Sequence, residues 1–173
     1  MREMIFLVGP RACGKTTVGK LLAKRLGLEY CDTDLYLAEQ TGRTVADIVE
    51  REGWDGFRRR ESEVLREVAR PGRVIATGGG IVLAAANREF MRQSGSVVYL
   101  HAPCEILAER LSKNPENAQR PSLTGKSVLE EIGEVLRERG PLYKDACHFH
   151  VAADRDLQVI LHELESLDKE TDK

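Results

Sequence analysis

The hydrophobic positions along the chain alternate between two kinds of pattern, which predicts strands that alternate with helices. Met4–Val8 is apolar without interruption, as expected of a strand that is buried on both faces. Between Thr16 and Leu26 the apolar residues instead recur at helical spacing, and Gly27 gives a stop signal. The same alternation continues to a last predicted helix at residues 156–166.

The pattern assigns an element to most of the chain. We predict five strands, at residues 4–8, 28–31, 73–76, 97–100 and 147–151. We predict helices at residues 16–26, 34–40, 44–52, 54–68, 83–92, 103–111, 127–139 and 156–166, with Gly140 and Pro141 favouring an end at Arg139. Strands and helices in alternation imply right-handed crossovers and an α/β fold with a parallel sheet. Ligands of such folds bind outside the carboxyl ends of the strands.

Length and composition fit one soluble domain of 173 residues, with 42% hydrophobic and 31% charged residues. The 26 Lys and Arg do not exceed the 28 Asp and Glu, so no overall positive charge favours nucleic acid as a partner. No apolar stretch approaches the ~18 residues needed to span a membrane, and the first apolar run is too short for a signal peptide. We therefore expect a cytoplasmic protein whose four cysteines are free thiols rather than two disulfides.

Residues 9–16, Gly-Pro-Arg-Ala-Cys-Gly-Lys-Thr, match the phosphate-binding pattern G-x-x-x-x-G-K-[ST]. Glycines let the backbone N–H groups surround an anion, and the following helix adds its positive N-terminal end. Lys15 is expected to reach the β- and γ-phosphates, and the Thr16 hydroxyl to bind Mg²⁺. A turn that merely caps a helix is the alternative, but the strand before it and the helix after it favour a nucleotide site. We assign to ATP the residues Ala12, Cys13, Gly14, Lys15, Thr16 and Thr17.

Two carboxylates, Asp32 and Asp34, follow directly after the second predicted strand. Mg²⁺ on a nucleotide normally has a protein carboxylate beside the threonine of the loop. Side chains two residues apart point the same way in an extended chain, so one aspartate can serve the metal while the other addresses an acceptor hydroxyl. Alternatively, either aspartate simply caps the helix that begins near Leu35.

Two arginines are candidates for binding an anionic acceptor. Arg139 falls on the apolar stripe of its predicted helix, where a guanidinium is partly buried and needs a partner. That partner is either a bound carboxylate or phosphate, which suits the forked geometry of arginine, or an acidic residue of the chain itself. Arg58 lies in a run of three arginines, a pattern that is also typical of a solvated helix face.

Two further segments each have a functional and a structural interpretation. The three glycines at 78–80 either bring the backbone close to a small ligand or form a flexible connection. Residues 112–126 are polar, contain two prolines and show no periodicity, which favours a lid over a disordered segment. Arg120 lies in this segment, where a mobile cation could cover the transferring phosphoryl group.

Together these segments resemble the shikimate kinase family over nearly the whole chain. The resemblance rests, in order and spacing, on GPRACGKTTVG (9–19), DTD (32–34), GFRRRE (56–61), ATGGG (76–80), RPSLTG (120–125) and RERGPLY (137–143). It is greatest for the shikimate kinase 2 type, whose lid has the same RP-x-L-T-G form. The loop alone is shared by many NTPases, whereas the combination is far more specific.

The resemblance implies one nucleoside-monophosphate-kinase-like P-loop domain over residues 1–173, with five parallel strands in the order 2-3-1-4-5. It also implies a substrate-binding part at about 34–61, a lid at about 112–126 and a monomer. The implied reaction transfers the γ-phosphoryl group of ATP, with Mg²⁺, to the 3-hydroxyl of shikimate, in the biosynthesis of chorismate and aromatic amino acids. The implied roles are catalysis by Lys15, Asp34 and Arg120, metal contact by Thr16 and Asp32, nucleotide contact by Arg110 and Arg120, and shikimate binding by Asp34, Arg58, Gly79, Gly80 and Arg139.

Three positions depart from the family's pattern. Ala12 stands where a glycine is common, Gly140 and Pro141 replace helix formers after Arg139, and no proline occurs near residues 154–156 to face the adenine. The departures affect the loop geometry, the placement of Arg139 and one wall of the adenine site. Three alternative functions stay open: another small-metabolite kinase such as gluconate kinase, a nucleoside monophosphate kinase, or an ATP-binding switch domain without catalysis.

Overall fold

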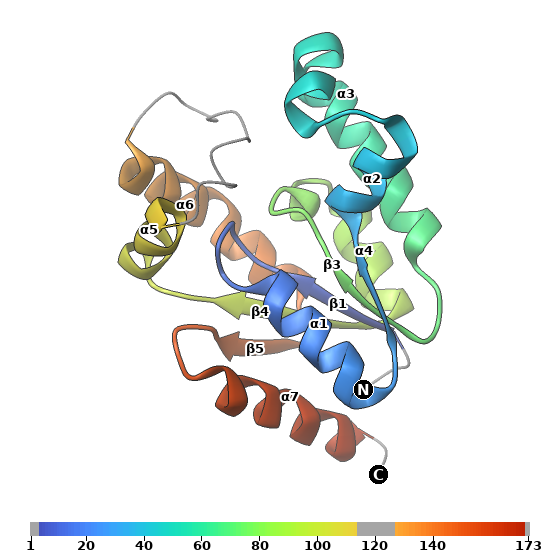
Figure 1. Ribbon diagram of the computed structural model, residues 1–173, viewed down its shortest axis with the longest axis vertical. Helices are drawn as coiled ribbons and strands as arrows, with labels where there is room; N and C mark the ends of the chain where they lie inside the picture. Colours follow the sequence, from blue (N-terminus) through green and yellow to red (C-terminus); the bar gives the residue numbers. More distant parts are fainter. Residues whose placement is uncertain (1–3, 114–126, 172–173) are drawn as a thin grey trace.

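The structure is a computed structural model that describes residues 4–113 and 127–171. One sheet of five parallel strands lies at its centre (Figure 1). The strands are β1 (Met4–Val8), β2 (Glu29–Asp32), β3 (Arg73–Ala76), β4 (Ser96–His101) and β5 (Phe149–Ala152). Their order is β2-β3-β1-β4-β5, which confirms the predicted fold class and strand order.

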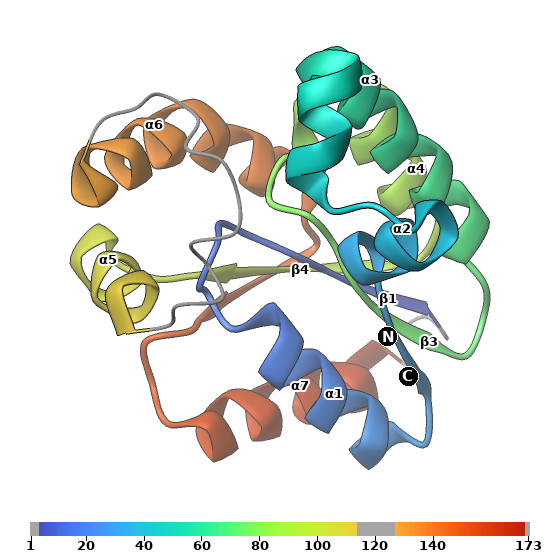
Figure 2. The ribbon, with the colours of Figure 1, turned by 45° about the horizontal axis from the view of Figure 1, so that its top comes forward.

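Helices cover both faces of this sheet (Figure 2). They are α1 (Lys15–Leu26), α2 (Thr33–Thr41), α3 (Val45–Val68), the 3-10 turn η1 (Ile81–Leu83), α4 (Ala85–Ser94), α5 (Cys104–Lys113), α6 (Val128–Ala146) and α7 (Leu157–Thr171). Side chains of a strand alternate between the two faces, so β1 contributes to two cores. Ile5 and Leu7 pack with α1, α5 and α7, whereas Phe6 and Val8 pack with α3, α4 and α6.

Most predicted elements are present with small shifts of their ends, and one boundary is wrong. Gly53, at φ 71 and ψ 177, interrupts α3 at the predicted position between its two parts. Gly140 and Pro141, however, do not end the helix at Arg139, because α6 continues to Ala146 with Pro141 inside it. A proline in a helix costs about 3 kcal/mol. The continuation buries Tyr143 and Ala146 completely, and this gain in packing offsets that cost.

Two predictions from composition have a counterpart in the structure. All four cysteines are free thiols, as predicted. Within the described ranges, 4–113 and 127–171, no helix combines the length and the apolar character that a membrane crossing requires.

The parallel arrangement places the carboxyl ends of β1, β2 and β3 at one edge of the sheet. β1 leads into the loop before α1, β2 ends at Asp32, and β3 leads into Thr77 and the glycines at 78–80. In folds of this class the ligand site lies at this edge. The segments with candidate chemistry are therefore neighbours in space although they are far apart in sequence.

Candidate active site

The loop between β1 and α1 has the backbone of an anion-binding loop. Gly9 and Gly14 have φ values of 147° and 99°, in a region that glycine enters readily. A Cβ at Gly9 would lie 2.5 Å from the carbonyl oxygen of Leu100, so no larger residue fits there. Ala12 has a φ of 63° and is, among the described residues, the one non-glycine residue with a positive φ. Ala12 therefore adopts a left-handed conformation that glycine would enter at lower cost.

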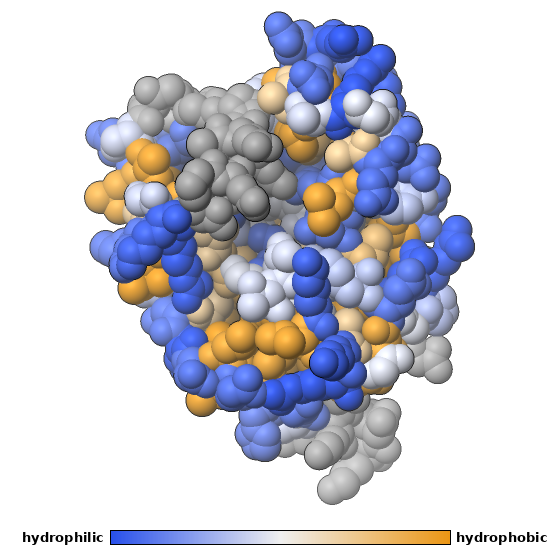
Figure 3. All heavy atoms as spheres, in the orientation of Figure 1, coloured by the Kyte–Doolittle hydropathy of each residue, from blue (hydrophilic) through white to orange (hydrophobic). Residues whose placement is uncertain are grey.

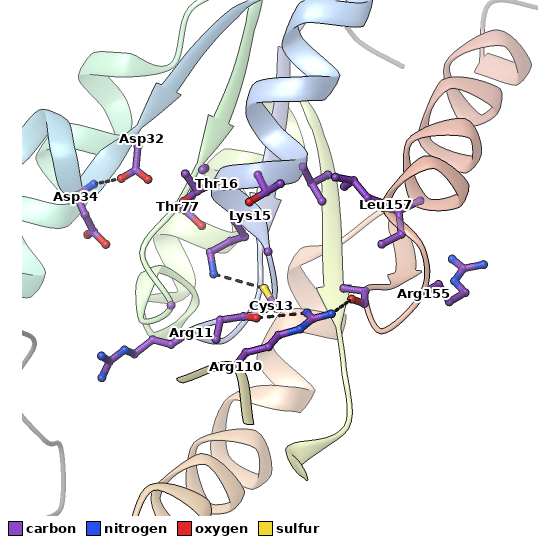
Figure 4. A pocket seen from close by; sticks show the side chains of 18 of the residues that line it. Arg11, Cys13, Lys15, Thr16, Asp32, Asp34, Thr77, Arg110, Arg155 and Leu157 are labelled. Carbon is purple, nitrogen blue, oxygen red and sulfur yellow. Dashed lines mark hydrogen bonds between the residues drawn. The ribbon is translucent and has the colours of Figure 1, made fainter. Parts of the chain in front are cut away.

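Lys15 lies folded over this loop. Its Nζ donates to the carbonyl oxygens of Gly9 and Pro10, each at 2.8 Å, and lies 3.6 Å from the Sγ of Cys13 (Figure 4). The ammonium group is thus held on the inner side of the loop, next to the N-terminal end of α1, where an anion is favoured. In Figure 3, residues of intermediate hydropathy gather in the middle of the face above α1.

A cavity of about 570 Å³ opens at this loop. It is lined by all the described residues that were predicted to serve ATP and the metal: Ala12, Cys13, Gly14, Lys15, Thr16, Thr17, Asp32 and Arg110. Arg110 on α5 crosses one side of the cavity and donates to the carbonyl oxygens of Ala12 (3.4 Å) and Ala153 (2.8 Å) (Figure 4). Arg155 and Leu157 also line this cavity, next in sequence to the position where the family's pattern has a proline.

Asp32 and Asp34 differ in their surroundings. The Oδ1 of Asp32 accepts from the backbone N–H groups of Asp34 (2.9 Å) and Leu35 (3.1 Å), so Asp32 is the N-cap of α2. Its Oδ2 accepts from the Tyr30 hydroxyl at 3.3 Å, and Asp32 lines the large cavity. Asp34 lies in the first turn of α2 and lines both the large cavity and a smaller one beside it.

The smaller cavity, of about 50 Å³, holds the predicted acceptor residues. Asp34, Arg58, Gly79, Gly80 and Arg139 all line it, together with Trp54, Phe57 and Glu61. Three residues, Arg11, Asp34 and Gly79, line both cavities. The two cavities are therefore contiguous, with a carboxylate, a guanidinium and a glycine backbone at their junction.

Arg58 is fixed by its own helix rather than solvated. Its guanidinium lies over the rings of Trp54 and Phe57, at 5.4 and 5.2 Å from their centroids. Its Nη1 donates to Glu61 at 2.9 Å, and Glu61 is only 3% exposed. Burial raises the pKa of the Glu61 carboxyl, and the positive charges of Arg58 and Arg139 oppose this rise.

Arg139 is 8% exposed, which confirms the predicted burial on the apolar stripe of α6. Its Nε has no hydrogen-bond partner among the residues that the structure describes. Glu61 acts on it only through its charge, since the Glu61 carboxylate is bonded to Arg58. A buried guanidinium with an unsatisfied donor favours a bound anion over an internal acid as its partner.

The glycines at 78–80 form an anchored turn rather than a flexible connection. The Gly78 N–H donates to the Thr33 hydroxyl at 3.1 Å, and the Gly79 carbonyl accepts from the Tyr143 hydroxyl at 2.5 Å. A Cβ at Gly80 would overlap the guanidinium of Arg58. A Cβ at Gly78 would likewise overlap the Oε1 of Glu61, so close approach of the backbone to its neighbours explains why glycine occupies positions 78 and 80.

Several site residues had no role in the prediction. Arg11, Glu61 and Tyr143 occupy the junction or hold its parts, and Arg155 lines the nucleotide side. Glu61 had a signal, since it is one turn from Arg58 in the quoted GFRRRE segment. Arg120 and residues 114–126 of the predicted lid lie outside the described residues, whereas Ser112 and Lys113 are the end of α5.

The sheet order and the phosphate-binding loop define a P-loop NTPase with the fold of the nucleoside-monophosphate-kinase type. The family model described as "Shikimate kinase" matches residues 11–168. Shikimate kinase 2 of Dickeya chrysanthemi is 56% identical over 95% of each chain, and shikimate kinase 2 of Syntrophotalea carbinolica is 54% identical over 98% of this chain and 99% of its own. The shikimate kinase from Acinetobacter baumannii in complex with shikimate has a TM-score of 0.90 at 38% identity, covering 97% of this chain and 93% of the other. The chain belongs to the shikimate kinase family.

Proposed function

We propose that this protein transfers the γ-phosphoryl group of ATP to the 3-hydroxyl of shikimate. One observation carries the proposal. A phosphate-binding cavity and a smaller cavity, lined by the buried Arg139 and the half-buried Arg58, meet at Arg11, Asp34 and Gly79, at the carboxyl edge of the sheet. Such an arrangement holds a donor phosphate next to an anionic acceptor, and positioning is the main source of catalysis in phosphoryl transfer. The family relationship supports shikimate as that acceptor.

On the donor side, the loop N–H groups and Lys15 hold the phosphates, and Arg110 packs along the adenine. The Thr16 hydroxyl and the Asp32 carboxylate fit Mg²⁺, because both residues line the cavity and both supply the oxygen ligands that Mg²⁺ prefers. Mg²⁺ usually keeps several waters, so a water-mediated contact with Asp32 suits this geometry. Bound there, Mg²⁺ neutralises charge on the phosphate oxygens.

On the acceptor side, Arg58 and Arg139 hold the carboxylate of shikimate as charge-assisted, forked donors. Asp34 orients the hydroxyls and takes the proton of the attacking one as its oxygen bonds to phosphorus. The backbone at Gly79 and Gly80 supports the ring. Arg120, from the predicted lid, covers the phosphates. The cytoplasmic location and monomeric state stay predictions.

A coupled assay that measures the release of ADP tests the proposal. The acceptor in the assay is shikimate, gluconate, AMP or water. We expect turnover with shikimate alone. Preferential turnover with gluconate or AMP would assign the protein to another kinase activity, and release without any acceptor would favour a switch domain. Arg58→Ala adds a second test, since loss of a buried guanidinium–carboxylate contact costs about 2–5 kcal/mol. The KM for shikimate should rise roughly 30-fold or more while the KM for ATP changes little.

A further inference from the structure

Arg11 occupies the junction between the two cavities. It is the third residue of the phosphate-binding loop, and it lines both the large cavity and the smaller one. Figure 4 shows its side chain extended away from Arg110, on the side of the loop opposite the adenine wall. Lys15, by contrast, donates to the loop carbonyls and lines the large cavity but not the smaller one. Arg11 is thus the loop side chain that faces both donor and acceptor.

We infer that Arg11 is a further catalytic residue, whose guanidinium contacts the phosphoryl group during transfer and then holds it on the product. The inference rests on the proposed function. In the transfer, the bond from the γ-phosphorus to the β,γ-bridging oxygen of ATP breaks and that oxygen leaves with ADP, a bond from phosphorus to the acceptor oxygen forms, and the hydroxyl proton passes to Asp34. The phosphoryl group moves from the large cavity toward the smaller one, so a cation at the junction stays beside it throughout.

The surroundings of Arg11 favour this role. Burial lowers the pKa of its guanidinium, and the negative charge of Glu131 on α6 partly opposes that effect. A half-buried guanidinium interacts with a phosphate more strongly than a solvated one because little water screens the charges. The other cations of the small cavity, Arg58 and Arg139, are separate from this task, because Arg58 is bonded to Glu61 and neither residue lines the large cavity.

The test compares the intact wild-type protein with Arg11→Ala and Arg11→Lys. Arg25→Ala is the matched control. Arg25 pairs with Glu165 and lies in the last turn of α1, at the opposite end of this helix from the phosphate-binding loop. Calorimetry without nucleotide gives the Kd of shikimate and of shikimate 3-phosphate, and the coupled assay gives kcat. For Arg11→Ala we expect a kcat about 10- to 100-fold lower and a similar rise in the Kd of shikimate 3-phosphate, as for one lost charge-assisted contact.

The Kd of shikimate itself should stay within about 3-fold, and Arg11→Lys should fall between wild type and Arg11→Ala because it keeps the charge but loses the fork. An equal rise in both Kd values, or no change in kcat and in product affinity, would overturn the inference. Thermal unfolding of each variant separates a folding defect from a lost contact. If the wild type fails to phosphorylate shikimate, the proposed function fails, and that result is independent of the variants.

Discussion

The hydroxyl of Tyr143 donates to the carbonyl oxygen of Gly79 across 2.5 Å, although 64 residues separate them in the chain. Tyr143 is fully buried and lies one turn after Arg139 on α6. This hydrogen bond therefore ties the helix that carries Arg139 to the glycine turn, which also lines the small cavity. It fixes the distance between two parts of the proposed acceptor site.

Tyr143→Phe should lower both stability and shikimate binding. The change leaves the buried Gly79 carbonyl without its donor, which costs about 1–3 kcal/mol of unfolding free energy in a urea titration. We also expect a several-fold rise in the KM for shikimate, with the KM for ATP nearly unchanged. Tyr99→Phe is the matched control, because its ring stacks on Tyr143 at 5.0 Å and the bond to Gly79 is kept. Equal KM effects of the two variants would show that the hydrogen bond from Tyr143 to Gly79 does not support the acceptor site.

Gly80→Ala and Gly79→Ala should differ although the residues are adjacent. A Cβ at Gly80 would overlap the guanidinium of Arg58, whereas a Cβ at Gly79 meets nothing closer than 3.5 Å. Neither glycine has a positive φ, so alanine fits both backbones. Because the Arg58 guanidinium is the far end of a flexible side chain, it can move aside with little loss of stability.

The expected result is a KM for shikimate at least about 10-fold higher in Gly80→Ala, as for a weakened charge-assisted contact, and near the wild-type value in Gly79→Ala. Melting temperatures of the two variants should lie close together. Initial rates at saturating ATP measure the difference. Similar KM values for both variants would contradict the assignment of Arg58 to the acceptor.

Ala12→Gly should stabilise the protein. Ala12 has a φ of 63°, and this left-handed conformation costs a non-glycine residue roughly 1–2 kcal/mol, which glycine would not lose. Glycine also makes the unfolded chain more flexible, and this effect offsets part of the gain in stability. We expect a net gain of about 0.5–1 kcal/mol in the free energy of unfolding. Ala38→Gly, inside α2, is the control and should lose about 1 kcal/mol. A loss in both variants would mean that another contact fixes Ala12.

The fold and the phosphate loop were predictable because each has a local signal. The apolar run of β1 and the fixed spacing of Gly14, Lys15 and Thr16 specify a strand, a turn and a helix without reference to distant residues. Parallel strands then bring Asp32 and the glycines after β3 to the same edge, so even their neighbourhood followed from topology. Sequence therefore predicted which segments meet.

The remaining features depend on contacts between distant elements. Nothing in the sequence near Pro141 shows that burying Tyr143 will outweigh the break, because the partner of Tyr143 is Gly79. The pairing of Glu61 with Arg58, and the unsatisfied Nε of Arg139 within the described residues, likewise depend on how α3 and α6 pack against the glycine turn. Arg11 occupies a position of the loop motif at which any residue is allowed, so the motif gives it no role. Its place between the two cavities follows only from the structure.

Arg139→Met should separate stability from function. Arg139 is 8% exposed and its Nε has no hydrogen-bond partner among the described residues, so the unliganded fold carries a buried charge that methionine would replace with apolar packing. Replacing such a charge is often neutral or stabilising, and we expect the free energy of unfolding without ligand to stay equal or to rise by about 1 kcal/mol.

The KM for shikimate should nevertheless rise about 30-fold or more, through loss of about 2–5 kcal/mol of binding. Arg66→Met is the control, because Arg66 on α3 contacts Phe90 and Asn87 of α4, lines neither cavity and should leave this KM unchanged. If Arg139→Met instead unfolds more easily and keeps the wild-type KM, then Arg139 serves the packing of α6, and the acceptor carboxylate must bind elsewhere.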